Sequence, residues 1–330
     1  MKKHVFSAVA ALLMLPALAA NAYALEAEEL VPVGSAVGIE LEADGVLIVG
    51  LTEVETDTGP ASPAEAAGLR TGDVICSVDG RATANAAEFL TVMSSIDAGE
   101  HSVTVRRDGK ELELRVTPAR NREGAYQFGL WLRDSVTGIG TVTFYDPNTG
   151  TFGALGHGIS DAGTGELLPF ETGSITGAEV VDVIPGNPGS PGELCGEFDR
   201  DTVLGVLNKN TDSGIFGTAS LEELGAPIPV AGEDEVTLGP ATIRSSVNGD
   251  GVREYSVEIS RIYRNATDSR FLLLTVTDPE LLEITGGIVQ GMSGSPIIQN
   301  GKLIGAVTHV LISDPAKGYG ISIEKMLEAA

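Results

Sequence analysis

Apolar positions in the first third of the chain are spaced for short strands and two helices. Ser62, Pro63 and Gly68 stand where a helix cap, a first helical residue and a closing glycine belong, so residues 62–68 predict a short helix. From Asn85 to Ile96 the apolar residues return at helical spacing and predict a longer helix. Strands are predicted at 37–41, 46–54, 73–78, 102–106 and 112–116. Residues 33–118 therefore predict a compact α+β unit.

Beyond residue 129 the pattern is almost entirely that of strands. Asn300-Gly301 is the turn pair typical of a hairpin. The run from Pro185 to Gly192 predicts a loop, which the sequence leaves open as flexible or rigid. Strands are predicted at 129–134, 140–145, 296–299, 302–310 and 318–323, and a last helix at 324–329. We therefore predict a mainly β protein, with an α+β unit followed by a larger β domain.

The composition agrees with two turn-rich domains. The chain has 330 residues, of which 42 are glycine and only 5% are aromatic. Its formal charge of -25 repels the phosphates of nucleic acids and anionic lipids, so neither is an expected partner. An ordinary solubilising surface is the simplest reason for this charge.

The first 24 residues have the pattern of an export signal. Lys2 and Lys3 precede an apolar run from Val5 to Ala20, and Ala22-Tyr23-Ala24 has the small residues of a cleavage site. We expect cleavage after Ala24. An uncleaved anchor is the alternative, because the run is nearly long enough to span a bilayer. Residues 25–32 are predicted to be a linker, and the mature protein to be soluble and exported.

Few residues could bind a metal or a cofactor. Cys76 and Cys195 lie far apart in different predicted domains, so we expect neither a disulfide nor a metal pair from them. The predicted mature chain has three histidines, namely His101, His157 and His309. We predict no metal and no cofactor.

The run from Gly291 to Pro296, Gly-Met-Ser-Gly-Ser-Pro, has the residues of a serine-nucleophile turn. Such a serine needs an exposed turn in which its own N–H and that of the residue two positions earlier meet at the developing oxyanion. This pattern predicts Ser293 as the nucleophile and the N–H groups of Gly291 and Ser293 as the oxyanion hole. The strands that follow resemble the closing barrel of trypsin-like proteases. Ser295 is the competing nucleophile, and a glycine-serine turn without chemistry is the other alternative.

A serine hydroxyl needs a base at neutral pH. His157 lies in a glycine-flanked corner, Gly-His-Gly, far enough before the serine for one barrel to supply the base and the other the nucleophile. His309 is its rival on the return strand, which in the trypsin-like arrangement lines the substrate groove together with Thr308. His101 lies in the predicted hairpin and is expected at the surface. We predict His157 as the base.

The third member of a triad orients the imidazole. Asp278 is our prediction, although Asp278-Pro279 also has the pattern of a helix cap followed by proline at the first helical position. The alternatives are Asp161, Asp182 and Asp201.

Ser62 to Ile75, Ser-Pro-Ala-Glu-Ala-Ala-Gly-Leu-Arg-Thr-Gly-Asp-Val-Ile, resembles the signature of bacterial PDZ domains. In such domains a peptide adds as a strand opposite the long helix. The resemblance implies a groove at Val37, Gly38 and Ile39, across from the helix at 85–96. Gly34 to Val37 departs from the usual Gly-Leu-Gly-Phe loop. A PDZ domain that only packs on its neighbour is the alternative.

The later part of the chain resembles the SpoIVB family of serine peptidases (stage IV sporulation protein B). The resemblance is carried by the stretches 138–146, 152–161, 191–194, 285–296, 305–310 and 318–320. The family's His, Asp and Ser fall on His157, Asp278 and Ser293. The implied fold is a PDZ domain at 33–118, a connector at 119–135 and a peptidase domain of the trypsin-like double β-barrel type at 136–330.

This resemblance also implies a role. Family members are secreted into the space between the forespore and mother-cell membranes, where they cleave themselves and a membrane-embedded regulator and so trigger processing of a late sigma factor. The expected partners are protein or peptide substrates, and the PDZ domain binds a peptide segment or its own chain. A general envelope quality-control protease and a non-catalytic PDZ scaffold are the alternatives. The glycine-rich flanks of both catalytic residues also allow a resting site that is not yet assembled.

Overall fold

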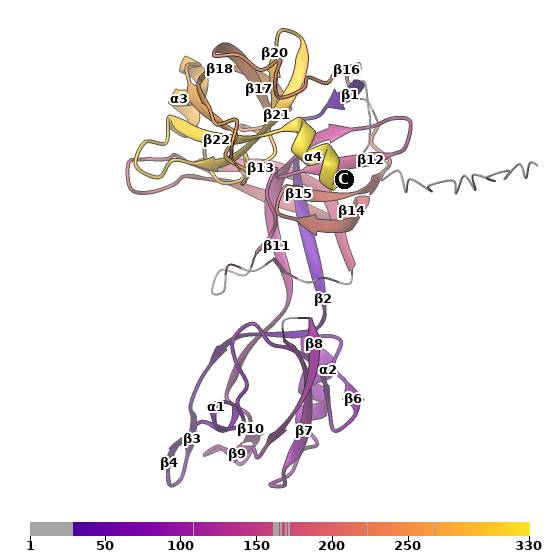
Figure 1. Cartoon of the computed structure of the whole chain (residues 1–330). Coiled ribbons are helices and arrows are strands. Elements are labelled where there is room, and N and C mark those ends of the chain that lie inside the picture. Colours follow the sequence, from indigo (N-terminus) through magenta and orange to yellow (C-terminus); the bar gives the residue numbers. More distant parts are fainter. Residues whose placement is uncertain are drawn as a thin grey trace, which may run out of the picture.

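A small unit is joined by two long strands to a larger pair of barrels in the computed structural model of the chain (Figure 1). The structure describes residues 29–107, 109–160, 165, 167, 168, 170, 172–222, 224–266 and 268–330. Strands make up 53% and helices 9%, which confirms the mainly β fold. The predicted signal and residues 25–28 lie outside the described residues. Among the described helices, none has the length and apolar character needed to cross a bilayer.

The small unit, here called the N-terminal unit, spans residues 46–133. The Asn85 side chain caps its longer helix by accepting the Glu88 N–H at 2.9 Å. Alternation along β7 sends Val103 and Val105 into the core, where they meet Phe89 of that helix. Its own elements are β3 (Val54–Thr56), β4 (Gly59–Ala61), α1 (Pro63–Ala66), β5 (Val74–Val78), β6 (Arg81–Ala82), α2 (Ala86–Met93), β7 (His101–Arg107), β8 (Lys110–Val116), β9 (Ala119–Arg120) and β10 (Tyr126–Gln127).

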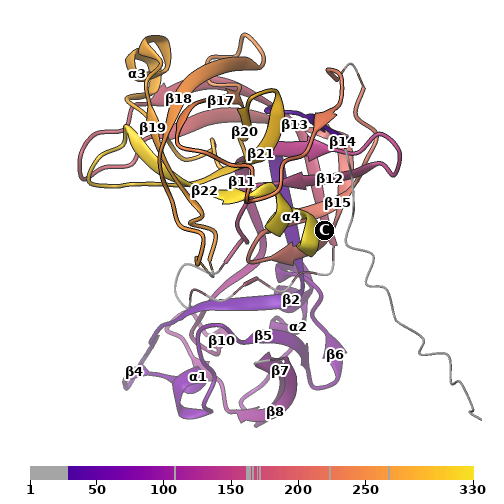
Figure 2. The same cartoon turned by 45° about the horizontal axis from the view of Figure 1, so that its top comes forward.

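Six antiparallel strands close the first barrel (Figure 2). Around the ring they are β2 (Ala36–Leu51), β11 (Leu130–Tyr145), β12 (Thr151–Ala154), β15 (Gly214–Ala219), β14 (Glu193–Thr211) and β13 (Thr172–Ile184). Buried residues such as Val142, Phe152 and Ile215 fill its interior. This barrel draws on strands from both sides of the N-terminal unit in sequence.

The second barrel is built from one continuous stretch of chain and also has six strands. On β18 the residues Tyr255, Val257 and Ile259 are buried while those between them are exposed, as expected for a strand with one face on the core. Around the ring the strands are β17 (Gly239–Ser245), β18 (Arg253–Ile262), β19 (Leu272–Val276), β22 (Lys317–Ser322), β21 (Lys302–Val310) and β20 (Pro296–Gln299). The helices α3 (Pro279–Thr285) and α4 (Ile323–Ala329) belong to the same stretch.

Residues 29–32, predicted as part of a linker, instead form the strand β1 (Glu29–Pro32). Val31 lies opposite Tyr145 of β11, and Leu30 opposite Ile228 of β16 (Ile228–Pro229). Leu30 and Val31 are buried. Burial of these two side chains and pairing on both edges explain why the segment is held against the barrel.

The strands β2 and β11 run through both the N-terminal unit and the first barrel (Figure 1). Residues 47–51 pair with 130–133 in the N-terminal unit, whereas 36–42 pair with 135–141 in the barrel. Between the two halves, Gly45 has a φ of +125°, and a Cβ there would lie 2.5 Å from the Ile75 oxygen. The structure therefore differs from the predicted boundaries. The segment 36–42 belongs to the barrel, and the predicted connector 119–135 supplies part of the N-terminal unit.

The predicted peptide groove at Val37, Gly38 and Ile39 is wrong. These residues pair with Gly138 to Gly140 of β11 on one edge and with Ile175 to Gly177 of β13 on the other. Val37 and Ile39 are buried in the barrel core. With both edges hydrogen-bonded, this segment has no backbone groups left for an added peptide strand.

Candidate active site

Ser293 lies in a tight turn, Gly291–Ser295, between α3 and β20. Gly291 and Gly294 have φ angles of +95° and +98°, a region in which side chains are strained. A Cβ on Gly294 would lie 2.0 Å from the Thr141 oxygen. The turn therefore needs glycine at position 294 both for its backbone angle and for its close approach to β11.

Along residues 290–295, four backbone N–H groups are paired and two are free. Gln290, Met292, Gly294 and Ser295 donate to carbonyl oxygens 2.8–3.2 Å away. In the described part of the chain, the N–H groups of Gly291 and Ser293 have no partner. Both residues are half-buried, whereas residues 292, 294 and 295 are buried. The two free donors are those expected of an oxyanion hole.

The strand β11 holds this turn by donating hydrogen bonds to carbonyl oxygens of the turn. The Thr141 N–H donates to the Ser293 oxygen at 3.0 Å, and the Thr141 hydroxyl donates to the Gly291 oxygen at 2.8 Å. The Thr143 hydroxyl donates to the Gly294 oxygen at 2.8 Å. Fixing these carbonyls leaves the N–H groups free for an oxyanion. Sequence reasoning missed these contacts. The available signal was the presence of threonine at both 141 and 143, because alternate positions of a strand place their side chains on one face.

The two candidate serines differ in access. The Ser293 hydroxyl is half-buried and donates to the Thr308 carbonyl oxygen at 2.7 Å. Ser295 is fully buried, and its hydroxyl has no partner among the described residues. A nucleophile must reach a peptide carbonyl, so the geometry favours Ser293 over Ser295.

His157 follows β12 at a sharp corner, where Leu155 and Gly156 have φ angles of +68° and +69°. Its Nδ1 lies 2.9 Å from the Gly158 carbonyl oxygen. A carbonyl only accepts hydrogen bonds, so Nδ1 carries the proton and Nε2 has the free lone pair. Burial lowers the pKa of His157, and the Gly158 bond offsets part of that effect. The imidazole is therefore neutral at pH 7, with the tautomer that a general base needs.

Asn210 of β14 fixes the chain just after this histidine. Its side-chain nitrogen donates to the Ile159 and Leu168 oxygens at 2.8 and 3.0 Å. Its side-chain oxygen accepts the Ile159 N–H at 2.9 Å. Sequence reasoning missed Asn210, because the pattern of β14 does not show which loop its side-chain amide will contact.

His157 and Ser293 both lie near the end of β21. Ser293 bonds the Thr308 oxygen, and the ring of the next residue, His309, has its centroid 4.9 Å from that of His157. No hydrogen bond joins His157 to Ser293 in the described part of the chain. The structure therefore shows the serine hydroxyl turned to a carbonyl and not bonded to the base.

His309 lies beside His157, and its ring is partly desolvated although the residue reaches the surface. Desolvation of its ring, together with His157 and Arg270, lowers the pKa of His309 to about 4. Its neighbour Thr308 is buried and offers its carbonyl oxygen to Ser293. Both predicted groove residues thus lie beside the nucleophile.

Asp278 does not lie against His157. Its Oδ1 accepts the N–H groups of Glu280 and Leu281 at 3.0 and 3.2 Å, and its Oδ2 accepts the Ser256 N–H at 3.1 Å. With Pro279 as the next residue and Gly286 at a φ of +71°, it caps α3. The predicted triad role is therefore not seen in this geometry, since three backbone donors take up the carboxylate.

The alternative carboxylates do not replace it. Asp182 is exposed and accepts the N–H of its neighbour Val183 at 2.8 Å. Asp161 and the side chain of Asp201 lie outside the described residues. Within the described part, the hydrogen-bond partner of His157 is a backbone carbonyl.

His101 is not a surface residue, contrary to our expectation. It is buried, and its Nδ1 lies 2.6 Å from Asp79 Oδ2. Burial opposes its charge, but the bonds to Asp79 and to the Asp97 oxygen prevail and raise the pKa of His101. It stabilises the N-terminal unit and takes no part in the candidate site.

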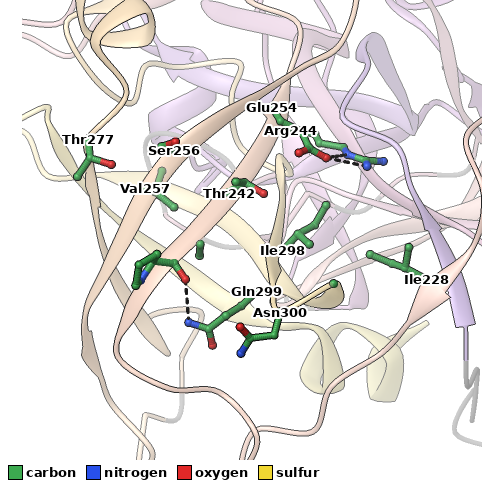
Figure 3. A pocket seen from close by; sticks show the side chains of 13 residues that line it. Ile228, Thr242, Arg244, Glu254, Ser256, Val257, Thr277, Ile298, Gln299 and Asn300 are labelled. Atoms are coloured by element: carbon green, nitrogen blue, oxygen red, sulfur yellow. Dashed lines mark hydrogen bonds and ion pairs between the residues drawn. The ribbon is translucent and has the colours of Figure 1, made fainter.

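Cys76 and Cys195 are not joined to each other by a disulfide. Among the described residues, no cluster of three or more His, Cys, Asp or Glu side chains has the spacing of a metal site. A hollow of about 530 Å³ on the outer face of the second barrel contains Arg244, Glu254 and Gln299 but none of the candidate catalytic residues (Figure 3). The residues around Ser293 and His157 therefore remain the candidate active site.

Two family models match the chain. That of the SpoIVB peptidase S55 matches residues 124–327, which is more than half of the chain. The chain belongs to the SpoIVB peptidase S55 family. That of the PDZ domain matches residues 37–117, so this SpoIVB-type serine peptidase carries an N-terminal PDZ domain. The residues 37–42 within that match are the ones that the structure assigns to the barrel.

Solved structures resemble parts of this SpoIVB-type chain. The PDZ domain of the SdrC-like protein from Listeria monocytogenes has 24% identity and a TM-score of 0.22, over 27% of this chain and 87% of that one. The active form of the Rv3671c protease from M. tuberculosis has 15% identity and a TM-score of 0.33, over 60% of this chain and 74% of that one. No curated protein sequence matches the chain.

Proposed function

We propose that this chain is an exported serine endopeptidase that cleaves itself and a membrane-associated regulatory protein, and so triggers late sigma-factor processing during sporulation. The peptidase activity follows from the family. Export is supported by the signal pattern of residues 1–24. The substrates, the sporulation role and the place between the forespore and mother-cell membranes rest on the resemblance to SpoIVB proteins.

One observation carries the catalytic part, namely two free N–H groups beside an accessible serine hydroxyl. The Ser293 oxygen attacks the peptide carbonyl, and Nε2 of His157 takes the hydroxyl proton. The negative oxygen that forms is bound by the N–H groups of Gly291 and Ser293. His157 then gives its proton to the leaving amine, and water hydrolyses the acyl-serine in a second round. A scaffold without activity would need no such pair of unpaired donors.

A fluorophosphonate probe tests the chemistry directly. The purified protein should be labelled covalently at one serine, and Ser293→Ala should remove the label. Ser295→Ala is the matched control and should still be labelled. Labelling that persists in Ser293→Ala but vanishes in Ser295→Ala would contradict the assignment.

The cellular role is tested separately. In a spore-forming host, a Ser293→Ala copy of the gene should block self-cleavage and late sigma-factor processing, while the protein is still made and exported. Normal processing with that copy would refute the sporulation role and leave the peptidase chemistry intact.

A further inference from the structure

The Pro-Gly run that joins β13 to β14, here called the Pro-Gly loop (residues 185–192), is closed on itself. The sequence did not decide whether it is flexible or rigid. Asn187 and Ser190 exchange two backbone hydrogen bonds of 2.9 and 2.8 Å, which makes the exposed tip a tight turn. At the buried base, a Cβ on Gly192 would lie 2.4 Å from the Gly186 nitrogen. The two limbs of the loop therefore touch at a point where a side chain has no room.

The Pro-Gly loop belongs to the first barrel but is bonded to the second. Three backbone hydrogen bonds of 2.8 Å join them, from the Gly186 N–H to the Thr285 oxygen, from the Gly189 N–H to the Ile312 oxygen, and from the Gln290 N–H to the Gly192 oxygen. Two of these partners precede the Ser293 turn in sequence, and one follows β21. The loop thus ties the segment before the nucleophile turn to the first barrel.

Gln290, the residue before the Ser293 turn, is held through both of its backbone groups. Its N–H donates to the Gly192 oxygen at 2.8 Å, and its carbonyl oxygen accepts the Leu194 N–H at 2.9 Å. The carbonyl of Gln290 and the N–H of Gly291 belong to one planar trans peptide, so they point in opposite directions. The bond from Leu194 therefore fixes the direction of the Gly291 N–H, which is one of the two free donors of the candidate oxyanion hole.

Side-chain packing restricts the same peptide. Leu194 is 1% exposed and belongs to the same buried cluster as Val289 and Met292. A Cβ on Gly291 would lie 3.0 Å from the Leu194 Cβ, so the leucine fills the space next to the Gly291 backbone. The carbonyl of Gly291 itself accepts the Thr141 hydroxyl at 2.8 Å. The peptides before and after Gly291 are thus held by two different strands of the first barrel, β14 and β11.

We propose that the Pro-Gly loop and Leu194 position the oxyanion hole, because they hold the Gln290–Gly291 peptide with its N–H directed at the substrate carbonyl. This inference rests on the proposed function. If the peptide turned over, the Gln290 carbonyl oxygen would replace the Gly291 N–H and repel the negative oxygen that forms during acyl transfer. The first barrel therefore supplies more than the base, since it also aligns an oxyanion donor of the second barrel. Gly192 and Leu194 are positioning residues, because they act through the Gln290 peptide.

Two glycine variants of the purified protein disturb the loop base to different degrees. Gly192→Ala would place a Cβ 2.2 Å from the Ile184 oxygen. It should slow fluorophosphonate labelling of Ser293 roughly 30-fold, because loss of one oxyanion donor lowers rates about 100- to 1,000-fold. Gly186→Ala is milder, with its Cβ 3.0 Å from Pro315, and should slow labelling roughly threefold. Labelling should still reach completion in both variants.

Gly177→Ala is the matched control. Gly177 also lies on β13, and its new Cβ would meet Asp199 at 3.7 Å, an ordinary contact distance. This variant should be labelled at the rate of the unchanged protein.

Phosphorus NMR of the phosphonylated protein separates positioning from a loss of folded protein. The adduct places a phosphonyl oxygen in the oxyanion hole, so its resonance depends on the hydrogen bonds made there. In Gly192→Ala the resonance should move toward that of the urea-unfolded adduct, and in Gly186→Ala it should move less. Gly177→Ala should leave it unshifted. A smaller folded fraction alone would not shift the signal of the folded adduct.

Each outcome decides a separate point. No labelling of the unchanged protein overturns the proposed function, and this inference with it. Normal labelling of both loop variants overturns the inference alone. Slower labelling with an unshifted phosphorus resonance also overturns it, because the loop would then act on something other than the oxyanion hole. If Gly192→Ala does not fold, Gly186→Ala decides by the same two measurements.

Discussion

The two barrels hold the two halves of the catalytic site in different ways. The second barrel is continuous in sequence, and its Ser293 turn is bonded to β11 through three carbonyl groups. The first barrel is assembled from separated segments, and it presents His157 on a loop whose later part is held by one amide, Asn210. The oxyanion donors are thus prearranged, whereas the Ser293 hydroxyl points to the Thr308 carbonyl and the base is supplied by the first barrel. The first barrel also shares β2 and β11 with the PDZ domain.

The largest expected effect comes from the base. His157→Ala should lower the rate constant for fluorophosphonate labelling about 1,000-fold, because general-base assistance is lost. His309→Ala should change it far less, because His309 is not the proposed proton acceptor and its ring is a tilted neighbour of His157, with the ring centroids 4.9 Å apart. Equal losses in the two variants would show that both barrels supply a proton acceptor.

Rigidity of the serine turn is tested at its glycines. Gly294→Ala should cost about 3 kcal/mol or more of folding free energy, because the new Cβ is strained and would meet the Thr141 oxygen. Gly301→Ala is the control, with a φ of +75° and open space around it, and should cost about 1 kcal/mol. Urea unfolding measures both. Similar costs would mean that the turn can yield.

The first barrel is tested at Asn210. Asn210→Ala removes three hydrogen bonds to the segment after His157 and should cost about 2 kcal/mol of stability. Labelling of folded protein should slow about tenfold, because the base is less well positioned. Asn248→Ala, which affects only a surface turn, should leave labelling unchanged. An unchanged labelling rate in Asn210→Ala would show that the His157 loop keeps its position without the Asn210 side chain.

Asp278 separates a structural role from a catalytic one. Asp278→Ala should lower stability by about 1–2 kcal/mol through loss of the α3 cap, with the labelling rate of the folded fraction unchanged. Asp278→Asn keeps an acceptor and should be milder. A rate loss much greater than the stability loss, present also in the Asn variant, would return Asp278 to the triad.

The smallest expected effect is a shift in the pH dependence of the labelling rate. Burial lowers the pKa of His157 from 6.5, so the neutral base persists below that pH. Labelling should therefore fall on acidification with a midpoint below 6.5. A midpoint above 6.5 in the folded protein would show that a carboxylate stabilises the imidazolium after all.

Local patterns predicted most of the elements and brought out Ser293 and His157 as the candidate pair. The hairpin of β20 and β21, both helices of the PDZ domain and the Ser293 turn depend on neighbours in sequence, so they could be recognised from spacing. The pairing of 36–42 with β11 and β13 could not, because a strand pattern does not specify its partner. The roles of Thr141 and Asn210 could not be predicted for the same reason, since their hydrogen-bond partners are distant in sequence. For Asp278 the sequence was compatible with a triad member and with a helix cap, and the backbone N–H groups that it accepts support the cap.

The exchange of strands between the PDZ domain and the first barrel has a consequence for how the protein is made. Neither the PDZ domain nor the first barrel can be cut out of the chain with all of its strands. A peptidase fragment that starts at residue 119 would lack β1 and the barrel half of β2. A PDZ fragment that ends at 118 would lack residues 130–133 of β11, which pair with β2 in that domain. During synthesis the barrel cannot close until β15 has been made, some 180 residues after the chain enters β2, so the nascent chain must stay unaggregated over a long loop closure.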